Sequence, residues 1–291
     1  MVFKNIYITN SGIALNRFLL IKNSVFNNVP IHSFYKYALY KKLTERKEII
    51  VLKNPIIIFN HWSSGFHHWV TESLVRLLSV QSISYDLILP ENYPSFAFES
   101  LETFKFNSIY KLPSKTGAIL SSVTIPPNPP SGIYEKQNLI KLKMHLFSAY
   151  YVTPNPIKNI YITRKNASKR KIENEDEIIP MLKQYNFEII DSSLLTFQQQ
   201  VELFSQCKIL ISIHGAGLTN VLFMDKQTQL IEFYKKNTFI NPCYENMCEA
   251  LEINFQRILC LGGKNNKTHV NLTDLVVNKN ELELLLKNII K

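Results

Sequence analysis

Long apolar runs are missing from this sequence, and so is an N-terminal segment with the composition of a signal peptide. No stretch approaches the ~20 consecutive apolar residues that a membrane-spanning helix needs. Residues 1–5 contain one lysine, and polar residues interrupt the apolar positions around them. We therefore expect a cytoplasmic protein that neither spans a membrane nor is exported.

Cysteine is also scarce. The four cysteines, Cys207, Cys243, Cys248 and Cys260, form no C-x-x-C pair, and no histidine stands at zinc-finger spacing from them. This spacing argues against a disulfide framework and against a structural zinc site. We predict buried free thiols in a reducing compartment.

Apolar residues and positive charge are present in quantity. Of the 291 residues, 46% are hydrophobic and 19% are charged, which is typical of a globular protein of one large or two ordinary domains. The net charge of +10 favours an anionic partner, such as a phosphorylated small molecule, a polyanion or an acidic membrane face. No lysine- or arginine-rich block of the kind found in nucleic-acid-binding tails is present. One local basic cluster comprises Arg164, Lys165, Lys169, Arg170 and Lys171.

Two proline-rich segments, 124–132 and 153–159, divide the chain. The apolar spacing between them predicts a helix over 133–151 that closes a first domain, with the second segment as a hinge. We predict an N-terminal domain, 1–152, and a C-terminal domain, 153–291. In the second domain, we expect strands at 159–163, 187–191, 208–213, 230–234 and 255–260, and helices at 173–185, 196–207 and 218–223.

The first domain is less regular. We expect a β-rich segment over the first fifty residues, strands at 54–60 and 85–90, and helices at 66–80 and about 96–106. Strands that alternate with helices indicate an α/β protein with parallel sheets. Two such domains form a cleft, which is where these folds bind ligands.

The segment His214-Gly215-Ala216-Gly217 follows a strand that the sequence predicts to be buried on both faces. Glycines that precede a helix N-terminus allow backbone N–H groups to approach an anion. The dinucleotide fingerprint G-x-G-x-x-G is incomplete, because Asn220 stands at the third glycine position. The alternative is a tight turn with a structural histidine.

Two further groups of residues carry chemistry. Arg164 and Arg170 follow a predicted strand, and guanidinium groups are suited to bidentate contacts with a diphosphate. Asn174 and Glu175 stand at the start of the acidic helix that comes next. In "FHHWVTES", His68 and Glu72 share one helix face, where a carboxylate beside a histidine can act as a general base. For the arginine segment, the alternative is a solvated charged loop. For the segment with His68 and Glu72, it is an ordinary amphipathic helix. H-E-x-x-H is absent, which argues against zinc.

The motifs "HHWVTES", "YITRKNASKRKIENE", "HGAGLTNVLFM" and "LIEFY" occur in this order and at these separations. The pattern, over about residues 60 to 260, resembles glycosyltransferase family 61. The family includes protein O-linked N-acetylglucosaminyltransferases, plant xylan-decorating transferases and bacterial capsule or lipopolysaccharide enzymes. The resemblance implies an inverting, metal-independent transferase of GT-B architecture, with two Rossmann-like domains facing each other. No D-x-D pair is present to hold a metal on the donor diphosphate.

The resemblance suggests the following roles. Glu72 or His68 deprotonates the acceptor hydroxyl, and His214 contacts the diphosphate or the donor sugar. Glu232, in "LIEFY", binds the ribose hydroxyls of the donor. The residues predicted to bind the donor are Arg164, Arg170, Asn174, Glu175, His214, Gly215, Ala216, Gly217, Asn220 and Glu232.

For partners, we expect a nucleotide-sugar donor, UDP-linked, with no other cofactor and no metal. The expected acceptor is a saccharide or a lipid-linked saccharide in bacterial capsule or lipopolysaccharide synthesis, at the inner face of an anionic membrane. A dinucleotide-dependent oxidoreductase or another nucleotide-binding protein is the alternative. A nucleic-acid-binding protein fits less well, because the basic residues follow no single stripe.

Overall fold

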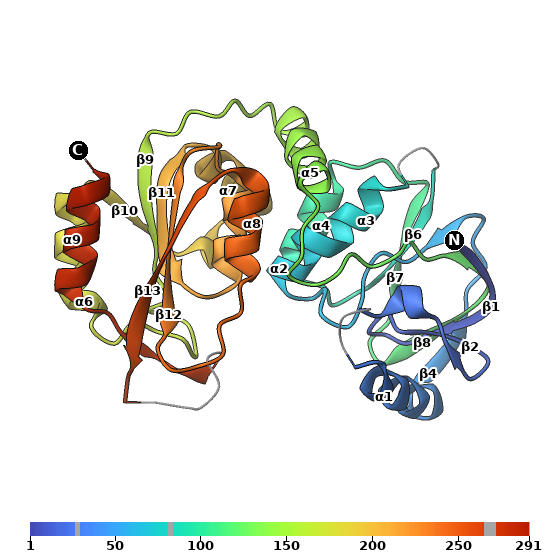
Figure 1. The fold of residues 1–291 in the computed structure, drawn as a ribbon. Coiled ribbons are helices and arrows are strands. Elements are labelled where there is room, and N and C mark those ends of the chain that lie inside the picture. Colours follow the sequence, from blue (N-terminus) through green and yellow to red (C-terminus); the bar gives the residue numbers. More distant parts are fainter. Residues whose placement is uncertain (27–29, 81–83, 265–271, 291) are drawn as a thin grey trace. The chain divides into compact units, whose positions relative to one another are not determined.

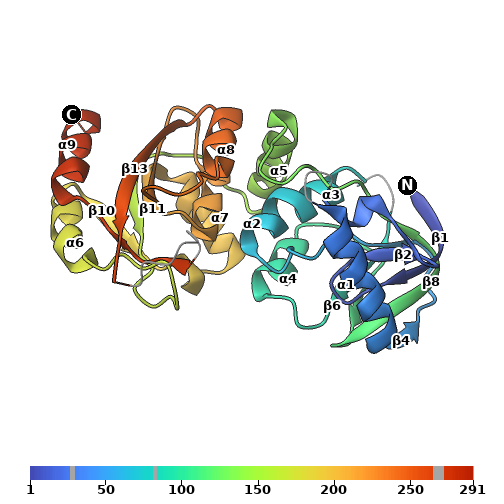
Figure 2. The same ribbon diagram turned by 60° about the horizontal axis from the view of Figure 1, so that its bottom comes forward.

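The computed structural model describes residues 1–26, 30–80, 84–264 and 272–290 (Figures 1 and 2). The chain forms two compact units, residues 1–142 and 143–291. The division falls inside helix α5 (Lys136–Ala149), whereas the sequence predicted a boundary after residue 152. Within the described ranges, no helix is long and apolar enough to cross a membrane.

Unit 1 is built on a mixed sheet that has eight strands within the described residues. The strand order is β3-β2-β1-β8-β5-β6-β7, and β4 pairs with β8. The strands are β1 (Val2–Ile8), β2 (Ala14–Asn16), β3 (Leu19–Leu20), β4 (Arg46–Ile49), β5 (Pro55–Ile56), β6 (Asp86–Pro90), β7 (Ser108–Leu112) and β8 (Thr116–Thr124). The helical segments are η1 (Lys22–Ser24), α1 (Ile31–Thr44), α2 (Phe66–His68), η2 (Trp69–Ser73), α3 (Leu74–Leu78) and α4 (Ser95–Leu101). Because β8, β5, β6 and β7 run parallel, the carboxyl ends of β5 and β8 lie side by side.

Two expectations for unit 1 were wrong in part. The first fifty residues contain β1 to β4, but α1 occupies Ile31–Thr44. This helix is rich in tyrosine and other residues that favour strands, and only Phe34 and Ala38 are fully buried, so its helical period is weak. The strand expected at 54–60 is reduced to β5 (Pro55–Ile56). The residues after β5 leave the sheet, and the carbonyl of Ile58 accepts a hydrogen bond from a buried arginine, Arg76.

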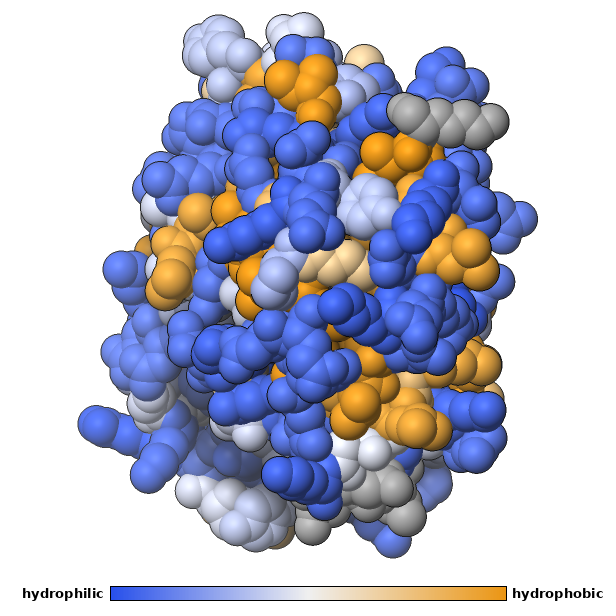
Figure 3. Space-filling model, turned by 90° about the vertical axis from the view of Figure 1, so that its left-hand side faces the viewer, coloured by the Kyte–Doolittle hydropathy of each residue, from blue (hydrophilic) through white to orange (hydrophobic). Residues whose placement is uncertain are grey.

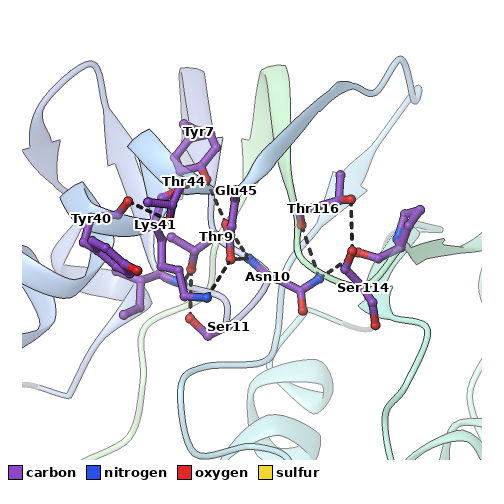
Figure 4. A network of polar contacts seen from close by, with 12 residues as sticks. Tyr7, Thr9, Asn10, Ser11, Tyr40, Lys41, Thr44, Glu45, Ser114 and Thr116 are labelled. Atoms are coloured by element: carbon purple, nitrogen blue, oxygen red, sulfur yellow. Dashed lines mark hydrogen bonds and ion pairs between the residues drawn. The ribbon is translucent and has the colours of Figure 1, made fainter.

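A polar network joins the end of α1 to the sheet (Figure 4). Tyr7 donates to Glu45 Oε2 over 2.8 Å, and the backbone N–H of Asn10 donates to the same carboxylate. The Asn10 side chain donates to the carbonyl of Thr116 over 3.2 Å. Burial, followed by the hydrogen bond to Glu45, raises the pKa of Tyr7, so its hydroxyl remains a donor. The Tyr7 ring lies directly against Gly117, where a Cβ atom would be only 2.4 Å from the hydroxyl oxygen.

We expect Gly117→Ala to destabilise unit 1 by about 1–3 kcal/mol, since the added methyl displaces a buried, hydrogen-bonded ring. The midpoint of urea unfolding measures this change. In a Tyr7→Ala background, where the ring is gone, the same substitution is expected to cost little. An equal cost in both backgrounds would show that the contact with Tyr7 is not the cause.

Unit 2 contains a sheet that has six strands within the described residues, in the order β10-β9-β11-β12-β13-β14. Its first five strands are parallel, and β14 is antiparallel. The strands are β9 (Lys158–Ile162), β10 (Phe187–Ile190), β11 (Cys207–Ile213), β12 (Gln229–Lys235), β13 (Asn254–Gly262) and β14 (Leu275–Val276). The helical segments are α6 (Glu175–Gln184), η3 (Ser192–Leu194), α7 (Phe197–Ser205), η4 (Ala216–Phe223), α8 (Cys243–Leu251) and α9 (Lys279–Ile289). This is the doubly wound order 2-1-3-4-5 of an α/β domain.

Helices cover both faces of this sheet (Figure 1). Helices α6 and α9 pack on one face, where Ile178 and Leu282 contact the strands through a shared core. The surface over these two helices is mainly hydrophilic and carries separate hydrophobic spots (Figure 3). The predicted strands of this unit and its predicted helices at 173–185 and 196–207 are confirmed, and Thr196 caps α7 with Gln199 in a capping box. The four cysteines are buried free thiols, as predicted.

Candidate functional site

A pocket of about 310 Å³ opens in unit 2 at the carboxyl ends of β9, β10 and β11. The chain leaves β9 for β10 on one side, and β11 lies on the other side of β9, so this is the switch point where open α/β sheets bind ligands. The polar residues that line the pocket are Thr163, Arg164, Asn166, Ser168, Lys169, Asp191, Ser192, Ser193 and Ser212. Gly215 and Gly217 complete the wall.

The two predicted arginines lie together beside this pocket: Arg164 lines it, and Arg170 contacts Arg164 and lies near Gly215. Arg164 Nε donates to the carbonyl of Arg170 over 3.1 Å, and Arg170 Nη1 donates to the carbonyl of His214 over 3.1 Å. A Cβ atom on Gly215 would lie 3.4 Å from Arg170 Nη1 and 3.7 Å from Arg164 Nη1. Burial lowers the pKa of both guanidinium groups, and that of Arg170 is lowered further by the charge of Arg164. The space beside Gly215, next to two guanidinium groups, is therefore electrostatically suited to an anion.

Gly217 has a packing role in addition to its place at the pocket. A Cβ atom here would lie 3.3 Å from Ser192 Oγ and 3.4 Å from two side-chain atoms of Ile162. The glycine therefore lets η4 lie close to the end of β9. The expected helix at 218–223 is a 3₁₀ helix that begins at Ala216.

A chain of ionic contacts fixes His214. Its Nδ1 lies 2.6 Å from Glu232 Oε1, and Glu232 Oε2 accepts from Arg257 Nε over 2.7 Å. The rings of Tyr234 and Tyr244 meet the imidazole edge-on. With Nδ1 engaged by a carboxylate, Nε2 is the nitrogen oriented for a ligand.

This arrangement corrects the role predicted for Glu232. Its side chain has no exposed surface, and both carboxylate oxygens already accept hydrogen bonds. A ribose ligand has to present its hydroxyls to a carboxylate that it can reach. Glu232 instead orients His214.

Three other residues predicted to bind the donor have structural contacts instead. Asn174 exchanges hydrogen bonds with the backbone of Val277 and does not cap α6 through its side chain. Glu175 is buried and accepts from the hydroxyls of Tyr161 and Thr163, so it holds the end of β9. Asn220 is fully buried, and its amide donates to Gln200. Burial leaves Glu175 and Asn220 little surface for a ligand, whereas Asn174 is partly exposed.

The His68–Glu72 pair is formed in unit 1. His68 Nδ1 lies 2.8 Å from Glu72 Oε1, and Glu72 Oε2 accepts from Asn60 Nδ2 over 3.3 Å. The Asn60 amide also donates to Asn128 Oδ1 over 3.2 Å. The Glu72 side chain is 2% exposed and that of His68 is 27% exposed. His68 is therefore the member of the pair that can reach a substrate, and Glu72 positions its ring.

The helix that carries this pair is not a regular α-helix. Residues Trp69–Ser73 form a π-helical turn, η2, between α2 and α3, and such turns are frequent at functional sites. Arg76, one turn beyond Glu72, is fully buried and donates to the carbonyls of Ile58 and Pro126, both over 2.7 Å. Burial lowers the pKa of Arg76 to about 9, and the charge of Glu72 opposes this shift. Arg76 thus ties together the segments after β5 and β8, which carry Asn60 and Asn128.

Sequence reasoning missed four residues of these sites: Asn60, Arg76, Asp191 and Arg257. Asp191 directly follows β10, and the rule that ligands bind at the carboxyl ends of parallel strands could have identified it. The other three depend on contacts between segments far apart in the sequence. Arg257, for example, meets Glu232 because β12 and β13 pair in parallel.

The part of the chain that the structure describes contains no group of three or more His, Cys, Asp or Glu side chains arranged for a metal ion. Metal independence stays a prediction.

A family model, Glycosyltransferase 61, matches residues 66–231, which include His68, Glu72, both arginines and the His214-Gly215-Ala216-Gly217 segment. The chain is also similar to EGF domain-specific O-linked N-acetylglucosamine transferase of Drosophila melanogaster, with 27% identity over 117 residues, 39% of this chain and 22% of that protein. The protein of the same name from Mus musculus is 29% identical over 101 residues, 33% of this chain and 19% of the relative. The matched segments span about a fifth of these relatives' length.

Proposed function

This chain belongs to glycosyltransferase family 61, and on that premise we propose that it transfers a sugar from a nucleotide-sugar donor to a saccharide acceptor. The observation that carries the proposal is the pair of adjacent arginines beside Gly215 and His214 at the switch point of unit 2. Two fixed cations suit a departing diphosphate, whose charge they neutralise as it develops. We infer that the transfer needs neither a metal nor a resident cofactor.

We propose that the donor lies along the pocket, with its diphosphate at the basic end and its nucleoside at the acidic end. Its diphosphate lies at the end of the pocket beside Gly215, near Arg164, Arg170 and His214, while its nucleoside extends toward Asp191; Arg164 and Asp191 both line the pocket. Asp191 Oδ1 accepts from the N–H and hydroxyl of Ser193, and Oδ2 has only a 3.5 Å contact with Asn166. A carboxylate repels phosphate but accepts hydrogen bonds from ribose hydroxyls. Asp191 takes the ribose role that the buried Glu232 cannot fill.

We propose that His68 is the general base. Its Nε2 takes the proton of the acceptor hydroxyl, and the Glu72 carboxylate stabilises the imidazolium that forms. The acceptor oxygen then attacks the anomeric carbon, and the bond from that carbon to the diphosphate breaks with its electron pair on the leaving group. Attack opposite the leaving group inverts the configuration. We also propose a GT-B architecture; the proposed base is a residue of unit 1, and the proposed donor-binding residues belong to unit 2.

For the substrates, we propose a UDP-linked donor and a saccharide or lipid-linked saccharide acceptor of capsule or lipopolysaccharide synthesis. The two similar transferases are named for N-acetylglucosamine, which makes its UDP derivative the first donor to test. The net charge of +10 favours a cytoplasmic protein held at the inner face of an anionic membrane.

Calorimetric titration in EDTA tests the donor site. The panel contains UDP, GDP, CMP, dTDP, NAD and a short oligonucleotide. The proposal predicts that one nucleoside phosphate, UDP, binds without metal. Binding of NAD alone would favour an oxidoreductase, and binding of the oligonucleotide alone would favour a nucleic-acid-binding protein.

Asp191→Asn tests the nucleoside end of the site. We expect the wild-type protein to prefer UDP over 2′-deoxy-UDP, and the variant to lose about 10- to 100-fold in affinity for UDP only, because a charged acceptor of the 2′-hydroxyl is removed. Asp176→Asn, on an exposed side chain of α6, is the matched control. Equal losses for both nucleotides would reject the ribose contact and leave the arginine site untouched.

A further inference from the structure

An exposed apolar surface lies on unit 1 and includes none of the residues of the two sites described above. It combines the turn between β2 and β3, Arg17 to Leu19, with the last turn of α1, where Tyr40, Lys42 and Leu43 lie; we call it the hairpin–helix patch. Phe18 is 63% exposed, Leu19 75% and Leu43 81%. Large apolar side chains that gather on a surface mark an interaction site.

Lys42 joins the two halves of the hairpin–helix patch. Its ammonium lies 4.6 Å from the centre of the Phe18 ring and donates to the carbonyl of Arg17. The helix end beneath is fixed to the sheet, because Glu45 accepts from Tyr7 and Asn10 (Figure 4). These hydrogen bonds therefore hold the backbone that carries the exposed side chains in place.

The charge of the hairpin–helix patch identifies its partner. Three basic side chains here make no ion pair with any residue that the structure describes: Arg17 and Lys42 of the patch, and Lys47 on the neighbouring strand β4. Partial burial, followed by repulsion from Lys47, lowers the pKa of Lys42. Positive charge around exposed aromatic and aliphatic side chains complements an anionic lipid surface, where the apolar groups enter the headgroup region and the lysines meet phosphates.

We propose that the hairpin–helix patch docks the protein on anionic membranes. This inference rests on the proposed membrane contact and names the surface that makes it, but it does not depend on sugar transfer. It places the β2–β3 turn and the end of α1 at the lipid headgroups.

Co-sedimentation with lipid vesicles tests the proposal on the full chain. Vesicles of phosphatidylcholine with phosphatidylglycerol are compared with pure phosphatidylcholine. We expect binding to the anionic vesicles only, reduced about tenfold by each of Phe18→Ser and Leu43→Ser and about fivefold by each of Lys42→Gln and Lys47→Gln. Leu284→Ser, on an exposed position of α9, and Lys183→Gln, on α6, are controls that keep wild-type binding.

The outcomes separate the two proposals. If the wild-type protein binds neither vesicle, membrane contact as a whole is wrong, and the hairpin–helix patch with it. If all four variants bind anionic vesicles like the wild type, another surface makes the contact. UDP affinity, measured on the same preparations, is expected to be unchanged in every variant and reports on the donor site alone.

Discussion

Replacement of His68 by alanine is expected to reduce kcat by about 10²- to 10⁴-fold, because it removes the general base. The affinity for UDP is expected to be unchanged, since the diphosphate contacts belong to unit 2. His32→Ala, on the exposed face of α1, is the control and keeps wild-type turnover.

Glu72 is a positioning residue in this account, because it is buried and acts through the His68 ring. Glu72→Gln is therefore expected to lower kcat less than His68→Ala does. Combined with His68→Ala, it adds almost no further loss, since residues that act as a unit are not additive. A double variant far slower than His68→Ala would show that Glu72 itself takes the acceptor proton.

The second large effect concerns the arginine pair. Arg164→Gln and Arg170→Gln are each expected to weaken UDP binding by about 10- to 100-fold, because each removes a charged hydrogen-bond donor to the diphosphate. Uridine, which lacks the phosphates, is expected to bind the variants as it binds the wild type. Titration calorimetry with both ligands in EDTA measures the difference.

Lys183→Gln removes the same charge from an exposed position on α6. It controls for the effect of the protein's net charge on UDP binding. It is expected to leave UDP affinity unchanged. Circular dichroism melting verifies that each arginine variant is folded. Equal losses for UDP and uridine would show that the arginines shape the pocket and do not hold the diphosphate.

The fold of unit 2 could be predicted from its sequence because its pattern is local. The strand Cys207–Ile213 is mostly apolar and scarcely alternates with polar residues, and α7 begins with a capping box that the sequence shows directly. Unit 1 was harder. The helix α1 is rich in residues that favour strands, and β8 pairs with strands from both the beginning and the middle of the unit, which no local pattern shows.

The candidate sites likewise have features that the sequence shows and features that only tertiary packing determines. Arg164, Arg170 and His214 were predicted from their residue types and their positions after predicted strands, and His68 and Glu72 from their shared face of a predicted helix. Their burial was not predictable, because it depends on tertiary packing. Glu232 and Glu72 both proved to be buried partners of a histidine; the ring of His68 is partly exposed, whereas that of His214 is itself largely buried. Asp191 has no distinguishing motif, and only the pocket shows that it faces the same space as Arg164.

The most direct test of the central claim is a transfer assay in EDTA. UDP-sugars, beginning with UDP-N-acetylglucosamine, are incubated with a panel of nitrophenyl glycosides, and products are identified by mass spectrometry and the NMR coupling of the new anomeric proton. We predict a product heavier by one glycosyl residue, with inverted configuration, formed without metal and lost in His68→Ala. A product that requires added Mg²⁺ or Mn²⁺, retains the donor configuration, or forms equally with His68→Ala would contradict the account.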